Sequence, residues 1–218
     1  GLHQAINYRF LAPADLRRAR VSTDAVPLAN PLSEERSVMR TSLLPSLVAA
    51  ASVALRHQAR SVSLFEVGRS FHPRGPSDVT ADPADMNLPV EREWLSVLLA
   101  GAADTWLGDE RAFDFYDLKG RVETLVHGLV GTLPELLADD PLAESALALH
   151  PRRRAAVRVA GETLGVIGEL HPEVVDDFGL DGRPQLKNLR ALGALYPETV
   201  QLITRADFGI RAVADSFD

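Results

Sequence analysis

The feature that most constrains the fold is an apolar face at helical spacing, followed at once by a short strand pattern. This face consists of Leu43, Leu47, Ala51 and Leu55. Their spacing predicts a helix that begins after Thr41 as its N-cap and ends between residues 57 and 60. Residues 62–68 then predict a short strand that stops at Gly68. Neither pattern by itself assigns a function.

Three other segments have strand patterns. Residues 3–11 alternate apolar with polar side chains, which predicts a half-buried strand. Residues 94–101 are nearly all apolar, as in a strand buried on both faces. Residues 155–159 and 163–167 predict a hairpin, because Gly161 between them supplies the positive φ of a tight turn.

Helical patterns lie between these strands. Asp117 is the predicted N-cap of an amphipathic helix that runs to about Leu129. Shorter helices are expected at residues 13–20, 134–138 and 171–178. This mixed order, without strict βαβ repetition, predicts an α+β fold with a largely antiparallel sheet flanked by helices. No internal linker interrupts it, so residues 1–218 are expected to form a single domain.

Proline-rich residues 71–90 are expected to form an exposed, mobile connection, since they contain four prolines among aspartates.

Composition excludes several classes of protein. A chain of 218 residues with 46% hydrophobic and 24% charged residues is typical of a globular protein. No apolar run approaches the roughly 20 residues of a spanning helix. The absence of cysteine excludes disulfides, thiol nucleophiles and the common structural zinc sites, and favours a cytoplasmic location. A net charge of -7 argues against a general nucleic-acid binder.

Asp114, Tyr116, Asp117 and Lys119 form the first candidate site, at the start of a predicted helix. A helix N-terminus can hold a phosphate. Acids at this position more often complement the helix dipole, and we favour that interpretation.

Two other candidate sites are pairs of residues. His150 and His171 each precede a proline and could bind metal or exchange protons, although a plain turn explains them as well. Glu66 and Arg69 lie at the end of a predicted strand, where an acid and a base could face a nucleotide. The alternative for this pair is a buried or edge ion pair. No glycine-rich phosphate loop, nucleophile elbow or His-Glu-x-x-His motif is present.

Several strings, in order, resemble one known family. They are residues 4–10, 30–35, 38–45, 64–69, 113–120, 150–154 and 168–172. Together they are similar to the catalytic-like core of the β subunit of bacterial phenylalanine–tRNA ligases, from about Leu2 to about Leu180. Two places depart from the family: Arg152 stands where glycine is usual, and residues 183–218 match poorly.

The resemblance implies a class II aminoacyl-tRNA synthetase-like fold without a working active site. Arg69 is kept on its strand, but the Phe-Arg-x-Glu signature expected after it is missing. Residues 166–171 offer one glycine and no arginine where class II enzymes have a glycine-rich strand followed by an arginine. An ATP site without these cations would leave phosphate charge uncompensated. We therefore expect no catalytic residue, metal or cofactor in this chain, and Glu66 and Arg69 are candidates for a degenerate nucleotide cleft.

The resemblance also implies partners. The whole enzyme is an α2β2 assembly that uses ATP and Mg²⁺ to attach phenylalanine to its tRNA, with catalysis in the α subunit. This core is expected to pair with the α subunit and to meet tRNA only through the whole enzyme, away from any membrane. The candidate contact residues are Leu43, Leu47, Asp114, Tyr116, Asp117 and Lys119.

Two other functions remain open. The chain could be a stand-alone nucleotide-binding or ligase-like enzyme that uses Glu66, Arg69 and Lys119. It could also be an RNA-binding module that uses the basic residues at 17–20 and 152–154, although a solvated face explains these clusters better.

Overall fold

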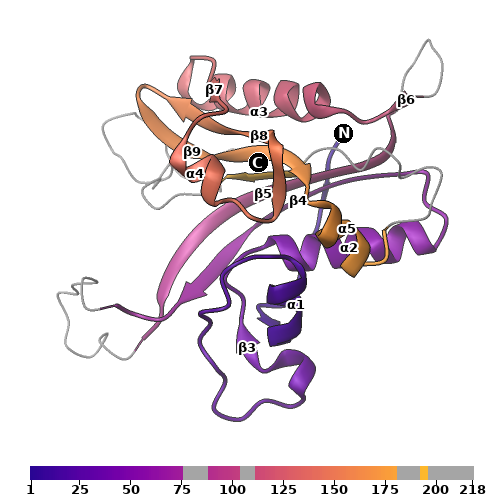
Figure 1. Ribbon diagram of the computed structural model, residues 1–218, viewed down its shortest axis with the longest axis vertical. Coiled ribbons are helices and arrows are strands. Elements are labelled where there is room, and N and C mark those ends of the chain that lie inside the picture. Colours follow the sequence, from indigo (N-terminus) through magenta and orange to yellow (C-terminus); the bar gives the residue numbers. More distant parts are fainter. Residues whose placement is uncertain (76–87, 104–110, 181–191, 196–218) are drawn as a thin grey trace, which may run out of the picture.

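A single twisted sheet with helices on both faces organises the computed structural model, which describes residues 1–75, 88–103 and 111–180 and the backbone of residues 192–195 (Figure 1). The strands are β1 (His3–Gln4), β4 (Ser61–His72), β5 (Val90–Ala103), β6 (Arg111–Ala112), β7 (Glu135–Leu137), β8 (Leu149–Val159), β9 (Glu162–Leu170) and β10 (Leu192–Leu195). Within these described residues the order is β1-β4-β5-β10-β9-β8-β7, with β6 paired to β5. The β1–β4 pair is parallel and the other pairs are antiparallel. The α+β prediction is confirmed.

The remaining elements surround this sheet. They are α1 (Pro13–Arg18), α2 (Leu44–Arg56), α3 (Phe115–Val130), α4 (Pro141–Ser145), α5 (Pro172–Asp177), the 3₁₀ turn η1 (Glu34–Arg36), and a small ribbon of β2 (Phe10–Leu11) and β3 (Val38–Met39). Figure 1 shows α3 on one side of the sheet and α2 on the other.

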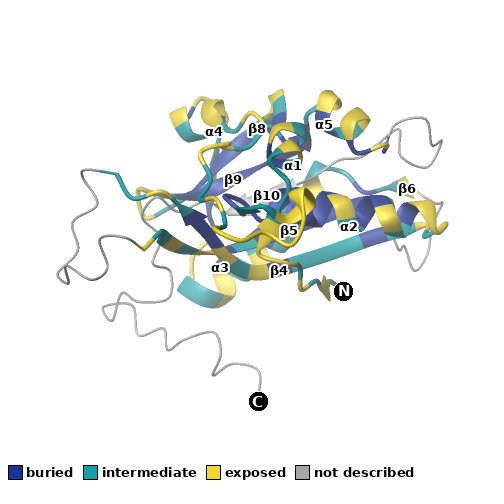
Figure 2. Ribbon diagram, turned by 90° about the horizontal axis from the view of Figure 1, so that it is seen from below, coloured by how far each residue is buried: buried dark blue, intermediate teal, exposed yellow. Residues whose placement is uncertain are grey.

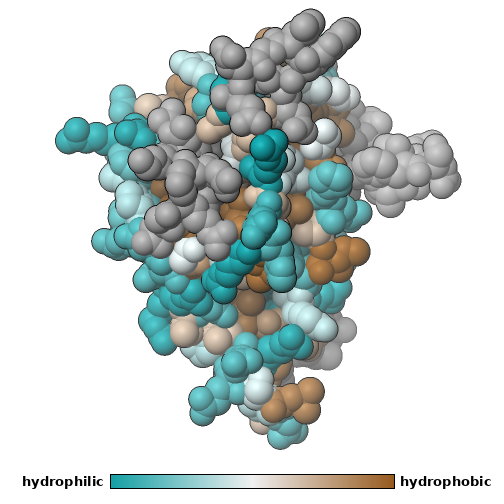
Figure 3. Space-filling model, turned by 90° about the vertical axis from the view of Figure 1, so that its right-hand side faces the viewer, coloured by the Kyte–Doolittle hydropathy of each residue, from teal (hydrophilic) through white to brown (hydrophobic). Residues whose placement is uncertain are grey.

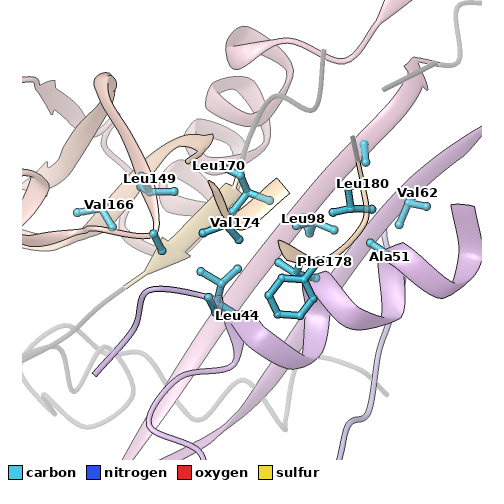
Figure 4. Close-up of a cluster of buried hydrophobic side chains, with 14 of the residues drawn as sticks. Leu44, Ala51, Val62, Leu98, Leu149, Val166, Leu170, Val174, Phe178 and Leu180 are labelled. Carbon is cyan, nitrogen blue, oxygen red and sulfur yellow. The ribbon is translucent and has the colours of Figure 1, made fainter. Parts of the chain in front are cut away.

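The sheet has a separate hydrophobic core on each face. Strand β5 contributes to both, because Leu98 and Ala100 belong to the core beside α2, whereas Val97 and Leu99 belong to the core beside α3. All four side chains are buried, which confirms the prediction of a strand covered on both faces. Figure 4 shows the α2-side core, where Leu44 and Ala51 face the strands.

Helix α2 lies close to its predicted position. Leu44, Leu47, Val48, Ala51 and Leu55 are buried, so one side of α2 faces the sheet while the other is exposed (Figure 2). The expected N-cap is wrong, because the Oγ1 of Thr41 donates to the Ser22 carbonyl at 2.6 Å. The N-cap residue is Leu43, and the Oγ of the preceding Ser42 accepts from the Leu44 N–H at 3.2 Å.

Helix α3 begins earlier than predicted. Asp114, not Asp117, is its N-cap, and Asp117 is the third helical residue. The Asp114 carboxylate accepts from the N–H groups of Tyr116 and Asp117, while the Asp117 carboxylate accepts from the Asp114 N–H. The two acids therefore form a reciprocal capping box.

The predicted hairpin is present as β8 and β9. Its two turn residues, Ala160 and Gly161, both have positive φ, of 50° and 84°. A two-residue turn with both φ values positive matches the twist of the flanking strands.

Two predicted segments have a different secondary structure from the one expected. Residues 3–11 do not form one strand, since only β1 and β2 pair with neighbours. Residues 134–138 were expected to form a helix but contain β7. A five-residue helix has little stability of its own, whereas pairing with the edge of β8 provides backbone hydrogen bonds. The helix lies just beyond, where Asp140 caps α4 before Pro141.

The expected connection at 71–90 is shorter than predicted. Strand β4 continues to His72 with Phe71 buried, and β5 begins at Val90. Residues 76–87 of this prediction lie outside the described residues. So does most of the tail at 183–218, apart from β10.

Candidate functional site

A buried ion pair joins the two strings that contribute most to the family resemblance. Arg40 follows β3 and Glu66 lies in the middle of β4, and each residue is only 2% exposed. The Arg40 Nη1 donates to Glu66 Oε1 at 2.6 Å, and its Nε donates to the Arg69 carbonyl at 2.8 Å. A charge so far removed from water is tolerated only when it is paired and hydrogen-bonded.

The N-terminal segment completes this pair. The Asn7 side chain donates to Glu66 Oε2 at 2.7 Å, so both carboxylate oxygens are satisfied. Gly68 leaves room for the guanidinium, because a Cβ there would overlap with the Nη2 of Arg40. Asn7, Arg40, Glu66 and Gly68, which we call the Arg40 lock, therefore fasten the N-terminal segment to β4.

The sequence suggests that Glu66 and Arg69 face one nucleotide site. In the structure the two side chains have different partners. Glu66 points to the Arg40 lock, whereas the Arg69 guanidinium is half-exposed and donates to Glu91 Oε2 at 2.8 Å and to Glu93 Oε1 at 3.2 Å. Hydrogen bonds from Arg69 to Glu91 and Glu93 raise the pKa of Arg69. Two carboxylates around one guanidinium leave this cluster with a net negative charge, which disfavours a phosphate.

Leu43 and Leu47 are not available to a partner. They are 1% and 0% exposed, because both side chains are packed inside this chain. The prediction that these two residues contact the α subunit is therefore wrong: the apolar periodicity of this helix reflects its own core.

The start of α3 does not offer an open anion site. Its N–H groups at Tyr116 and Asp117 already bind the Asp114 carboxylate. Arg111 donates to both oxygens of Asp117, at 2.6 and 2.7 Å, and these bonds lower the pKa of the Asp117 carboxyl. Lys119 lies 3.5 Å from Glu123. The dipole interpretation agrees with these contacts, and Tyr116 remains largely exposed.

The two histidines form matching His-Pro turns. His150 Nδ1 accepts from the Arg152 N–H at 3.1 Å, and His171 Nδ1 accepts from the Glu173 N–H at 3.2 Å at the start of α5. Among the described residues, no group of three or more His, Cys, Asp or Glu side chains could hold a metal ion. The turn interpretation accounts for these backbone contacts of both rings, and the His171 ring also lies 3.1 to 3.3 Å from the Nη1 of Arg20.

His171 gives the fold a pH dependence. Partial burial and the nearby Arg20 lower the pKa of this imidazole below its ordinary value of 6.5. The unfolded chain therefore takes up the proton first, and the free energy of unfolding falls as the pH drops below about 6.5.

We expect the urea midpoint to decrease between about pH 7 and about pH 5. His171→Ser, which keeps a capping oxygen, should show a smaller decrease; an equal decrease in both proteins would contradict this role.

Most of the arginines at positions 17–20 and 152–154 bind other groups of this chain. Arg18 binds Asp15 and the Asp177 carbonyl, and Arg20 binds Glu173. Arg153 binds Glu169, and Arg154 donates to the Ala146 carbonyl. These contacts favour the structural interpretation over an RNA-binding surface.

Comparison with known proteins identifies the family. A family model described as "Phenylalanyl tRNA synthetase beta chain CLM domain" matches residues 1–190. The chain belongs to this family. Curated β subunits of phenylalanine–tRNA ligase agree with it: the one from Vibrio vulnificus (strain YJ016) is 36% identical over 189 residues, and the one from Geobacillus kaustophilus is 35% identical over 188.

The matched region is a minor part of those relatives. The alignments cover 84% and 83% of this chain but only 22% and 21% of the two curated β subunits. Among solved structures, PylSc, a pyrrolysyl tRNA synthetase from Desulfitobacterium hafniense, matches with a TM-score of 0.56 at 13% identity, over 89% of this chain and 57% of that one. This likeness confirms a class II synthetase-like fold for the CLM domain.

The Arg40 lock of this CLM domain was not predicted as a unit. One signal in the sequence could have revealed it: Arg40 is the sole charged residue between positions 37 and 55. A lone charge in such an apolar stretch needs a buried partner.

Within the described residues, no helix is long and apolar enough to cross a membrane.

Proposed function

We propose that the chain is the non-catalytic core of a phenylalanine–tRNA ligase β subunit. In this proposal it pairs with the catalytic α subunit in a cytoplasmic α2β2 enzyme, which attaches phenylalanine to its tRNA with ATP and Mg²⁺. The observation that carries the non-catalytic role is the neutralised Arg69. Its guanidinium is held by Glu91 and Glu93, so the cation that could hold a nucleotide phosphate is already bound to carboxylates.

An exposed apolar row supports pairing with another protein. Ile6, Tyr8 and Phe10, which we call the N-terminal stripe, are 89%, 66% and 37% exposed. They follow β1 at one edge of the sheet, and the Arg36 guanidinium lies 3.9 Å from the centre of the Tyr8 ring. On the face shown in Figure 3, hydrophobic residues appear as separate groups among hydrophilic ones.

The stripe replaces Leu43 and Leu47 as the candidate contact for the α subunit. Exposed apolar residues that gather on one edge mark protein-interaction surfaces more often than scattered ones do. Tyr116, 73% exposed at the start of α3, remains a second candidate together with Asp114, Asp117 and Lys119.

Calorimetry with the purified α subunit tests the proposal. The chain should bind the α subunit and should give no heat with ATP and Mg²⁺. We expect Ile6→Asp to weaken association at least about tenfold, because a buried carboxylate costs more than the apolar contact it replaces.

Leu133→Asp is the matched control, since Leu133 is an exposed leucine outside the stripe and should tolerate the same change. Failure of the wild-type chain to bind the α subunit would contradict the pairing. Saturable binding of ATP would favour the alternative of a nucleotide-binding enzyme.

A further inference from the structure

A cavity of about 480 Å³ opens on the α2 side of the sheet and has no role in the proposed function. Four separate segments line it: residues 20–24 after α1, Ser42 and Leu44 around the start of α2, Leu142 with residues 145–149 from α4 into β8, and Val166 of β9. Because these segments surround it, the cavity is concave rather than a flat strip. Its volume falls within the range of small-molecule sites.

The floor of the cavity is apolar. Leu44, Leu149 and Val166 line it and are at most 2% exposed, so they belong to the core of this face. Figure 4 shows Leu149 and Val166 side by side on their strands, with Leu44 across from them. Leu147, 55% exposed, also lines the cavity. Because the three side chains of the floor are already buried, the apolar surface that a ligand could cover is mainly that of Leu147 and of the half-buried Val21, Leu142 and Ala146.

The rim of the cavity carries a cation. Arg20 lines it, with its backbone in the left-handed region at a φ of 54°. Its Nη1 contacts His171 and the largely exposed Glu173 carboxylate, while Nε and Nη2 have no hydrogen-bond partner among the described residues. An exposed ion pair of this kind is weak, so Arg20 retains donors for a second anion.

The lining also includes an acid and several hydroxyls. Asp24 is exposed on the same loop as Arg20. Three of the hydroxyls already have partners in the chain: Ser22 Oγ accepts from the Asp24 N–H, Ser42 Oγ accepts from the Leu44 N–H, and Ser145 Oγ donates to the Leu142 carbonyl. The buried part of the cavity is thus mainly apolar, and the cation that retains free donors is Arg20.

We propose that this cavity binds a small amphipathic carboxylate. The apolar body of the ligand covers Leu147 and the half-buried Val21, Leu142 and Ala146, and its carboxylate accepts hydrogen bonds from Arg20. The proposal depends on these side chains alone and is independent of pairing with the α subunit.

Calorimetric titration of the full chain with octanoate tests the site, with octanol as the uncharged control. We expect saturable binding of octanoate with one site per chain. Arg20→Gln should weaken octanoate at least about tenfold and leave octanol unchanged, because the variant removes a charge-assisted hydrogen bond but keeps the apolar floor.

A second variant separates cavity binding from adsorption elsewhere. Ala146→Phe places a ring at a half-buried lining position and should abolish binding of octanoate, while circular dichroism confirms that the variant remains folded. Equal binding by wild type and Ala146→Phe would overturn the proposal, as would equal affinity for octanol and octanoate.

A protein partner is the competing occupant, and the same proteins distinguish it. If octanoate does not bind the free chain and Ala146→Phe instead weakens association with the α subunit, the occupant is a side chain of the α subunit. That result would also overturn the small-molecule assignment.

Discussion

Gly101→Ala is expected to destabilise the fold by about 2 to 5 kcal/mol. Gly101, within β5, has a φ of 82°, a conformation that side chains with a Cβ rarely adopt. A Cβ there would also overlap with the Arg60 carbonyl oxygen and lie 3.1 Å from the Cα of Ser61. Both obstacles are backbone atoms of the neighbouring chain segment, so a change of rotamer cannot relieve them. Urea denaturation followed by circular dichroism measures the loss.

Gly120→Ala is the matched control for Gly101. Gly120 lies inside α3, and an added Cβ would meet no atom within 4 Å. Alanine in an exposed helix interior is expected to stabilise the protein by about 0.5 to 1 kcal/mol. The prediction is wrong if the two substitutions shift the urea midpoint in the same direction.

Glu66→Ala should cost about 3 to 5 kcal/mol, because it leaves the Arg40 guanidinium buried without its carboxylate. Arg40 and Asn7 would both lose a hydrogen-bond partner inside the protein. Urea denaturation again measures the change. As a control, Arg69→Gln removes an exposed guanidinium from Glu91 and Glu93 and should change stability little.

A double substitution distinguishes the effect of the buried charges on stability from the effect of side-chain volume. Replacing the pair together, with Arg40→Met and Glu66→Leu, should cost less than Glu66→Ala alone, because neither charge is then left unpaired. If the double variant loses as much stability as the sum of its single substitutions, the Arg40–Glu66 pair is not a coupled unit.

Local patterns predicted the elements whose residues are close in sequence. Helix α2 could be predicted because its apolar residues recur at helical spacing, and the β8–β9 hairpin could be predicted from Gly161. Helix α3 was shifted by three residues, since Asp114 and Asp117 are both good caps and only the backbone hydrogen bonds distinguish them. Strand β7 was missed because three residues carry no periodicity, and its pairing with β8 decides its structure.

The candidate site was harder to predict because its contacts are not local. Glu66 is three residues from Arg69 in the sequence, but its ion-pair partner is Arg40, which lies 26 residues earlier. Asn7 lies 59 residues before its partner Glu66. Leu43 and Leu47 were correctly apolar, but apolarity does not distinguish the core of a chain from its interface with another.

The position of β10 has a consequence for biosynthesis. This strand lies between β5 and β9 in the sheet but follows both of them in the sequence. While the ribosome is still making the preceding residues, the β4–β5 and β8–β9 hairpins can form, yet each presents a strand edge without its partner. Such edges pair readily with other chains. The nascent chain therefore remains open to misassembly until residues 192–195 have left the ribosome and joined the two halves.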